Sequence, residues 1–161
     1  MDPVLVVFTT THGSTGEVAE AIAGQFNSLG WPSELREIRE RPSLTGRRLV
    51  VVGAPIYNGR WSSAARRYLK RNRSALGAVP VAVFGMGPRE ATDEAVARSR
   101  SQLERSLTKL AWLDPLRTVV FGGVDPPKKH LHRDVRDWDA IDAWCTELAR
   151  VLSSATTIQA D

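Results

Sequence analysis

The sequence has little cysteine and no long hydrophobic run, and each absence excludes a class of protein. Among its 161 residues there is one cysteine, Cys145, which has no partner for a disulfide within the chain. Nothing therefore requires an oxidising compartment. No stretch approaches the roughly 18 apolar residues of a membrane span. The first apolar run, Val4 to Phe8, is too short for the core of a signal peptide. We expect a cytoplasmic protein without a membrane span.

Several well-known α/β signatures are also missing. No G-x-G-x-x-G fingerprint of dinucleotide-binding domains follows the first apolar run, and no G-x-x-x-x-G-K-[ST] loop of nucleotide hydrolases occurs. The G-x-S-x-G elbow of α/β-hydrolases is absent as well. The first apolar run ends in threonines, whereas phosphoacceptor receiver domains need paired acids there for Mg²⁺. The chain is therefore not expected to belong to any of these classes.

What the sequence does have is an excess of basic residues, with a formal net charge of +4. Such a balance suits nucleic acid, an anionic membrane surface, an acidic protein or an anionic small substrate. Composition does not choose among these. The basic residues lack interleaved base-stacking aromatics, so no nucleic-acid partner is expected. Peripheral contact with a membrane stays open.

Short apolar runs alternate with helical patterns along the whole chain, which indicates one α/β domain over residues 1–161. Apolar runs of this kind are typical of parallel strands that are buried on both faces of a sheet. Right-handed crossovers leave few ways to wind five such strands, and the order 2-1-3-4-5 is a common one. The expected strands are Val4–Thr9, Ser33–Ile38, Arg48–Gly53, Val79–Phe84 and Thr118–Phe121.

Residues at the ends of the helical patterns predict where the helices begin and end. We expect Ser14 or Thr15 to cap the first helix, and Gly30 to end it. Ser62 or Ser63 is expected to cap the second helix.

In open parallel sheets, ligands bind beyond the carboxyl ends of the strands, where the strand order reverses. For this chain that rule selects the loops that start at Thr9, Gly53, Gly85 and Gly122. Function is therefore expected to lie in these four loops.

The first of these loops is dense in hydroxyl groups and glycines. A helix start carries unpaired N–H groups and partial positive charge, so it binds phosphate readily. Thr10, Ser14 and Thr15 add neutral donors, and Gly13 permits close approach of the backbone. A plain capping loop is the alternative, because serine and threonine are preferred caps. His12 either contacts the phosphate or points to solvent.

Three segments resemble those of the flavodoxin family. Thr10–Thr15 looks like the phosphate signature [ST]-x-T-G-x-T, with His12 at the middle threonine; Gly53–Gly59 and Val81–Gly87 look like the second and third flavin loops. The resemblance implies a flavodoxin-like three-layer sandwich that binds flavin mononucleotide (FMN). The cofactor-binding residues that it implies are Thr10, Thr11, His12, Gly13, Ser14, Thr15, Pro55, Ile56, Tyr57, Asn58, Gly59, Trp61, Gly85, Met86 and Gly87.

Within the family, the chain most resembles the branch of menaquinone-linked protoporphyrinogen dehydrogenases. The residues that carry that likeness are Phe8–Thr10 with Gly13–Thr15, Gly53–Ala54 with Tyr57 and Gly59, and Tyr68–Lys70. That branch has a long, basic, aromatic-rich insertion after its fifth strand. The corresponding segment here, Asp125–Arg133, is shorter and lacks the aromatics.

The third loop differs from that of short electron-carrier flavodoxins, which place a tyrosine there against the outer flavin face. Residues 87–91 contain no aromatic, so one face is expected to stay open for a substrate, a hydride donor or a quinone. A run of cations without acids follows the second loop, and it is either a solvated helix face or a source of positive charge near the flavin. The latter predicts a higher reduction potential than in acidic electron carriers. The run is Arg60, Arg66, Arg67, Lys70, Arg71 and Arg73.

The remaining reactive side chains point to no specific chemistry, although a proton-relay or anion-contact role for His130 or His132 stays open. His130, His132 and Asp134 lack a fourth ligand at a recognised spacing, so no metal is expected. Cys145 lies on the apolar stripe of the last helix and is interpreted as a core residue. Three tryptophans are also interpreted as packing residues: Trp112, Trp138 and Trp144.

The sequence therefore predicts an FMN-binding redox protein, with an enzyme, an FMN-dependent oxidoreductase, favoured over a carrier. No catalytic acid or base stands out. The expected partner is a redox protein, a quinone or a small anionic substrate. Two alternatives stay open: a protoporphyrinogen/quinone-type dehydrogenase, and a flavin-free module that uses the first loop for another phosphate or partner.

Overall fold

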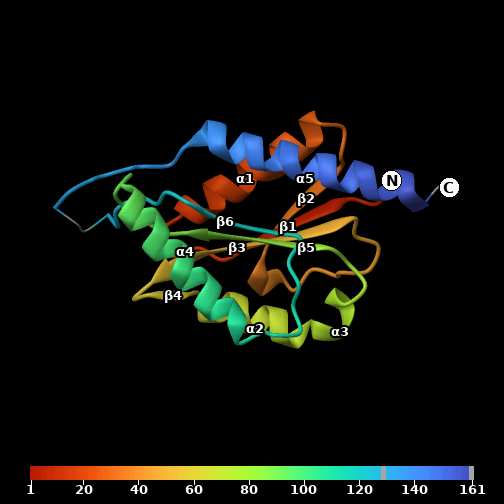
Figure 1. The fold of residues 1–161 in the computed structure, drawn as a ribbon, viewed down its shortest axis with the longest axis horizontal. Helices are drawn as coiled ribbons and strands as arrows, with labels where there is room; N and C mark the ends of the chain where they lie inside the picture. The colour runs from red at the N-terminus through yellow and green to blue at the C-terminus, as the bar shows by residue number, and fades with distance from the viewer. Residues whose placement is uncertain (128–129, 160–161) are drawn as a thin grey trace.

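The computed structural model describes residues 1–127 and 130–159, and in it a β-sheet lies between two layers of helices (Figure 1). One face of the sheet is covered by α1 (Ser14–Ser28) and α5 (Trp138–Gln159). The other face is covered by α2 (Ser63–Arg71), α3 (Arg73–Leu76) and α4 (Asp93–Thr108). The expected three-layer α/β sandwich is confirmed.

Five parallel strands form the sheet in the order β2-β1-β3-β5-β6. Counted along the chain as parallel strands, this is the predicted order 2-1-3-4-5. A sixth, two-residue strand, β4 (Arg60–Trp61), pairs antiparallel with β3 and was not predicted. The other strands are β1 (Val4–Phe8), β2 (Ser33–Glu37), β3 (Leu49–Tyr57), β5 (Val81–Met86) and β6 (Arg117–Phe121), and a 3-10 helix, η1 (Ile38–Glu40), follows β2.

The central strands are apolar throughout because each of their faces packs against helices. In β1, Val4 and Val6 belong to the core beneath α1 and α5. Leu5 and Val7 belong to the core beneath α2 and α4. Alternate residues of a strand point to opposite faces. A strand that is buried on both faces therefore does not alternate between apolar and polar residues.

Strand β3 continues through residues that were expected to form a loop. It was predicted to end at Gly53, but it runs to Tyr57. Its last pair with β1 joins Phe8 to Gly53, whereas its pairing with β5 continues to Pro55 and Met86. Pro55 therefore lies past the end of β1, where no N–H is needed for that ladder, so a proline is tolerated in the strand.

The start of α1 also differs from expectation. The residue before the helix is Gly13, in the left-handed conformation with φ of 96°, and no side chain caps this end. The prediction of Ser14 or Thr15 as the cap is wrong, because both residues already lie inside the first turn. The predicted end is confirmed: Gly30 has φ of 85° and follows the last turn. Ser62 caps α2, as predicted, with its Oγ accepting from the N–H of Ala65.

Among the aromatic and thiol side chains, the packing predictions are mostly confirmed. Trp144 packs edge-on against Phe84 and Phe121. Cys145 is fully buried, and burial raises the pKa of its thiol to about 12. The packing prediction for Trp138 is wrong: it is the first residue of α5 and lies largely exposed, beneath the guanidinium of Arg136.

Trp112 is partly buried and packs against the core beneath α2 and α4. No helix in the described part of the chain is long and apolar enough to cross a membrane.

Candidate functional site

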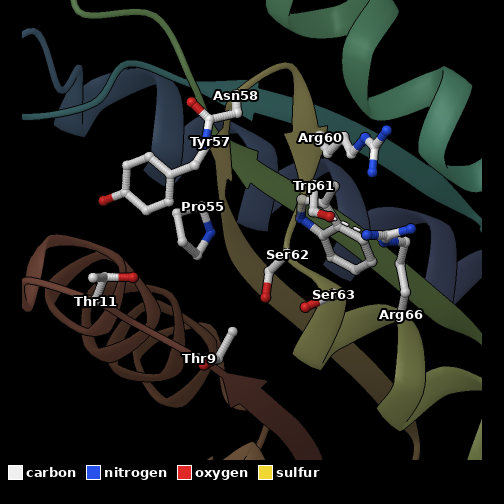
Figure 2. A pocket seen from close by; sticks show the side chains of 10 residues that line it. All are labelled: Thr9, Thr11, Pro55, Tyr57, Asn58, Arg60, Trp61, Ser62, Ser63 and Arg66. Carbon is white, nitrogen blue, oxygen red and sulfur yellow. Dashed lines mark hydrogen bonds between the residues drawn. The ribbon is translucent and has the colours of Figure 1, made fainter.

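A cavity of about 580 Å³ opens at the carboxyl edge of the sheet, where the sequence analysis placed the ligand. That volume is typical of small-molecule sites. Its walls come from the first loop, the end of β3, the β3–β4 turn and the start of α2 (Figure 2). The lining residues are Thr9, Thr11, Pro55, Tyr57, Asn58, Arg60, Trp61, Ser62, Ser63 and Arg66.

One wall of this cavity is a β-hairpin that the sequence analysis missed. Asn58 and Gly59 have φ of 51° and 74°, and they join the paired residues Tyr57 and Arg60. Two positive φ angles in a two-residue connection are the geometry of a type I′ turn, for which Asn-Gly is the preferred sequence. The dipeptide was therefore a usable signal. The turn carries Tyr57 and Asn58 to the rim, where both side chains are exposed.

The first loop places unpaired backbone donors next to the cavity. The N–H of Gly13 donates to Oγ1 of Thr10 at 2.9 Å. Within the described residues, the amides of Ser14, Thr15 and Gly16 have no hydrogen-bond partner, since the first turn of a helix has no acceptor for them. Three free amides and the positive end of a helix dipole form an anion-binding arrangement.

The hydroxyl groups of this loop are not equally available. Thr15 is only 1% exposed, so its side chain lies in the protein interior. Thr10 and Ser14 are partly exposed, and Thr11 and His12 are exposed. Thr10 Oγ1 already accepts the Gly13 N–H, which leaves its own proton free to donate.

Five of the predicted cofactor-binding residues lie together around the cavity: Thr11, Pro55, Tyr57, Asn58 and Trp61. Of the other residues of the first loop, Ser14 and Thr15 form the start of α1, and Thr10, His12 and Gly13 precede it. Among the residues of the predicted second and third flavin loops, Ile56, Gly85 and Met86 are buried within the sheet, and Gly87 is partly exposed. The ring-edge contact expected from residues 85–87 therefore stays a prediction, with Gly87 the most accessible of them.

Trp61 lies beneath the cavity, and its indole is not an outer wall. The side chain is fully buried, and its Nε1 donates to the carbonyls of Ala54 and Phe84, both at 3.2 Å. An indole held in this way has no free face for stacking. It supports the floor of the cavity by tying the ends of β3 and β5 together.

Five lining residues were not among the predicted site residues but had been noticed in other roles: Thr9, Arg60, Ser62, Ser63 and Arg66. Ser62 was expected as a helix cap, and Arg60 and Arg66 belong to the run of cations after the second loop. The Nε of Arg66 donates to the carbonyl of Trp61 at 3.1 Å, which fixes the arginine against the hairpin. No acidic residue in the described part of the chain lines this cavity, so its described wall is positive.

The third and fourth loops are joined by hydrogen bonds and ion pairs. The N–H of Gly123 donates to the carbonyl of Pro88 at 2.8 Å. Arg133 donates to the carboxylate of Asp125 from its backbone N–H at 2.8 Å and from Nε at 2.9 Å, and it also pairs with Glu90. These bonds with Arg133 hold the pKa of Asp125 below its usual value. Gly123, Asp125 and Arg133 of the fourth loop are thus fixed next to the third loop.

Asp134, considered above as a metal ligand, has a different role. Its carboxylate pairs with Arg136, whose guanidinium also reaches Glu17 in the first turn of α1. No cluster of three or more histidine, cysteine or acidic side chains suited to a metal occurs in residues 1–127 and 130–159.

Comparison with known proteins points to one family. The family described as "Flavodoxin domain" matches residues 5–132. The protoporphyrinogen IX dehydrogenase [quinone] of Escherichia coli K12 is 24% identical over 127 residues, which cover 77% of this chain and 70% of that protein.

Solved structures share the fold. A flavodoxin from the domain Archaea aligns with a TM-score of 0.58 at 15% identity over 94% of this chain and 99% of its own. Oxidised flavodoxin 1 from Bacillus cereus gives 0.58 at 17% identity, over 92% and 97%. The rubredoxin oxygen:oxidoreductase of Desulfovibrio gigas gives 0.60 at 14%, and 96% of this chain aligns with only 37% of that larger chain.

Proposed function

The chain belongs to the flavodoxin domain family, and from that premise we propose that it is a redox protein whose cofactor is FMN. The expected flavodoxin-like fold and family are both confirmed. The identity of the cofactor, the residues that hold it and the reaction are proposals, which the following observations support.

The observation that carries the proposal is the start of α1. FMN differs from riboflavin by one phosphate, which is doubly charged near neutral pH. The unpartnered amides of Ser14, Thr15 and Gly16 form the start of α1, where the helix dipole favours negative charge. Thr10 adds a hydroxyl donor beside them and holds Gly13 in place. These residues would hold the phosphate.

The cavity next to this loop suits the remainder of the cofactor. Its hydroxyl groups, at Thr11, Ser62 and Ser63, would hydrogen-bond a polyol chain. The exposed ring of Tyr57 at its rim would pack against a flat aromatic ring. Backbone groups near Gly87 would contact the edge of that ring.

When bound, FMN supplies the transfer of hydride or electrons, and the protein supplies position and electrostatics. Arg60 and Arg66 keep positive charge beside the cavity. In the described residues no histidine or acid lines the cavity, so we assign no catalytic acid or base. The absence of an aromatic in residues 87–91 leaves room for a partner at one face. A redox protein, a quinone and a small anionic substrate are the proposed partners.

The test compares FMN with riboflavin in a binding titration followed by flavin fluorescence. We expect FMN to bind much more tightly, and Thr10→Val to weaken FMN at least tenfold by removing a hydroxyl that serves both loop and phosphate. Riboflavin affinity should not change in this variant. Thr45→Val, an exposed threonine before β3, is the matched control. Equal affinity for the two flavins would reject the phosphate site.

A second candidate is a dehydrogenase that passes electrons from protoporphyrinogen to a quinone. It is favoured by the Escherichia coli relative of that name, which aligns with most of this chain. The short segment Asp125–Arg133 argues for a different substrate, because it lacks the aromatic-rich insertion of that branch. The test measures whether the FMN-loaded protein oxidises protoporphyrinogen with a menaquinone analogue as acceptor. Turnover supports this dehydrogenase, and its absence supports a different substrate.

A titration with inorganic phosphate and with other phosphate esters, set beside the one with FMN, decides the non-enzymatic alternative. A flavin-free phosphate-binding module would bind inorganic phosphate at the first loop but would discriminate poorly between FMN and other phosphate esters. We also propose a cytoplasmic location, which the buried, unpaired Cys145 suits.

A further inference from the structure

A second cavity, of about 250 Å³, lies on the other side of the β3–β4 hairpin, between its turn and the last turn of α4. It shares Asn58, Arg60 and Arg66 with the first cavity. The two cavities are therefore neighbours around one hairpin. The lining residues of the second are Asn58, Gly59, Arg60, Arg66, Arg105, Ser106 and Lys109.

The charge of this second cavity is one-sided. Among the described residues, four that line it are cations and none is acidic. Within residues 1–127 and 130–159, these four cations form no ion pair. In the same part of the chain, eight of the other fifteen arginines have a carboxylate partner, as in the pairs Arg36–Glu34, Arg47–Glu34, Arg89–Asp125, Arg117–Glu147, Arg133–Asp125 and Arg136–Asp134.

Helix electrostatics explain only half of this cluster. Arg105 and Lys109 lie at the carboxyl end of α4, where a cation is stabilised by the helix dipole. Arg60 and Arg66 come from the hairpin and from α2, and their presence adds repulsion at that same place. An anion between the four side chains would turn the repulsion into attraction.

The backbone around the cavity is held in position by hydrogen bonds. The N–H of Trp61 donates to Oγ of Ser106 at 3.1 Å, which ties the hairpin to α4. Ser106 is only 6% exposed, and its own hydroxyl proton has no acceptor among the described residues. Arg66 is fixed through Nε to the Trp61 carbonyl, so its terminal nitrogens stay available. Figure 2 shows the guanidinium groups of Arg60 and Arg66 on the same side of the hairpin, away from Thr9 and Thr11.

We propose that this second cavity binds the anionic group, phosphate or carboxylate, of the small molecule that exchanges electrons with the cofactor in the first cavity. The guanidinium groups supply paired N–H donors that match either oxyanion, and Lys109 adds a compact charge. Because the cavities share a wall, a substrate anchored here places the rest of its structure at the first cavity. The identity of the substrate class rests on the proposed redox function; the anion site itself does not.

The test uses the full chain saturated with FMN, so that the first loop is occupied, and follows binding of inorganic phosphate and of succinate by calorimetry. We expect one saturable site for at least one of these ions. The variant Arg105→Gln/Lys109→Gln should weaken that binding at least tenfold, because it removes two of the four charges. Its affinity for FMN should be unchanged, since neither residue lines the first cavity. The control Arg67→Gln/Lys70→Gln removes the same charge from exposed positions of α2.

Tighter binding of phosphate supports a phosphorylated substrate, and tighter binding of succinate supports a carboxylated one. Binding of neither ion, or binding that the Arg105/Lys109 variant does not weaken, overturns the proposal. Failure of the protein to take up FMN would reject the redox function separately. Anion binding that depends on Arg105 and Lys109 would in that case still support the second site.

Discussion

The ring of Phe84 lies directly over the backbone of Gly53, its partner on the neighbouring strand. A Cβ atom added at Gly53 would lie 1.9 Å from Cζ of Phe84, far inside van der Waals contact. The ring cannot move aside easily, because it also packs against Phe121, with ring centroids 5.8 Å apart, and against Trp144, at 6.3 Å. The aromatic cluster beneath α5 thus depends on a residue without a side chain in β3.

Gly53→Ala should therefore destabilise the protein by about 1–3 kcal/mol or more, the usual cost of overpacking a core. Urea unfolding followed by circular dichroism measures the change. Gly24→Ala in α1 is the matched control: its Cβ would meet nothing within 4 Å, and alanine should gain about 0.5–1 kcal/mol over glycine in a helix. If Gly53→Ala unfolds at the same urea concentration as the parent, the proposed clash is wrong.

Positive charge beside the first cavity should raise the reduction potential of bound FMN, because it stabilises the added electrons. Replacing Arg60 and Arg66 by glutamine should lower the potential by on the order of 20 mV per charge, from about 1 kcal/mol for each charge near 4 Å in water. A spectroscopic redox titration measures this. Removal of two exposed cations, Arg67→Gln/Lys70→Gln, should change the potential less. Equal shifts in the two variants would mean that the charges act only through the net charge of the protein.

The hydroxyl of Tyr68 is buried and has no hydrogen-bond partner among the described residues. Tyr68→Phe should therefore keep or raise stability, by up to about 1 kcal/mol, since an unsatisfied buried hydroxyl is unfavourable. Burial also raises the pKa of Tyr68 to about 12. The unfolded chain ionises first, so the parent should lose stability between roughly pH 10 and 12, and the variant should lose less. Unfolding at pH 8 and pH 11 tests both statements, and a loss of stability at pH 8 would reveal a hidden partner.

The Asp125–Arg133 contact should make the joined third and fourth loops sensitive to acid. Because the pKa of Asp125 is lowered by its bonds with Arg133, the contact stabilises the protein above the pKa of an unfolded aspartate. That contribution is lost as the pH falls through the lower folded value. Asp125→Asn should flatten the decline of stability below about pH 4. Glu104→Gln, at an exposed position of α4 that forms no ion pair in the described part of the chain, serves as control, and identical acid profiles for parent and Asp125→Asn would contradict this.

The sheet and its strand order were predictable because the evidence for them is local. Runs such as Val4–Phe8 are apolar on both faces, which indicates buried parallel strands. The right-handed crossover rule then limits the order in which these strands can be arranged. The end of β3 was not predictable in the same way. Whether Gly53–Tyr57 forms a strand or a loop depends on pairing with β5 and β4, which are distant in sequence or unpredicted.

At the candidate site, the rule that ligands bind beyond the carboxyl ends of parallel strands predicted the edge of the sheet. The hydroxyl groups and glycines of residues 10–15 predicted the loop at the start of α1. The parts that were missed follow from the hairpin. Once Asn58 and Gly59 turn the chain back, Ser62 and Ser63 come to face the first loop, whereas the guanidinium of Arg66 lies on the far side of the hairpin. The position of Trp61 could not be read from its place in the chain. Its burial comes from two carbonyls on different strands that only the folded sheet brings together.

The Asn58–Gly59 turn has a consequence for how such a protein can diverge. Because its hairpin forms part of the wall of both cavities, a one-residue insertion there would break the positive-φ pair and rotate every following side chain of β4 to the opposite face. Under the two proposals made above, a lineage that lengthens this turn would change its binding of FMN and its binding of the anionic substrate in a single step. Substitutions confined to α4 would change only the binding of the proposed anionic substrate, because α4 contributes to the second cavity and not to the first.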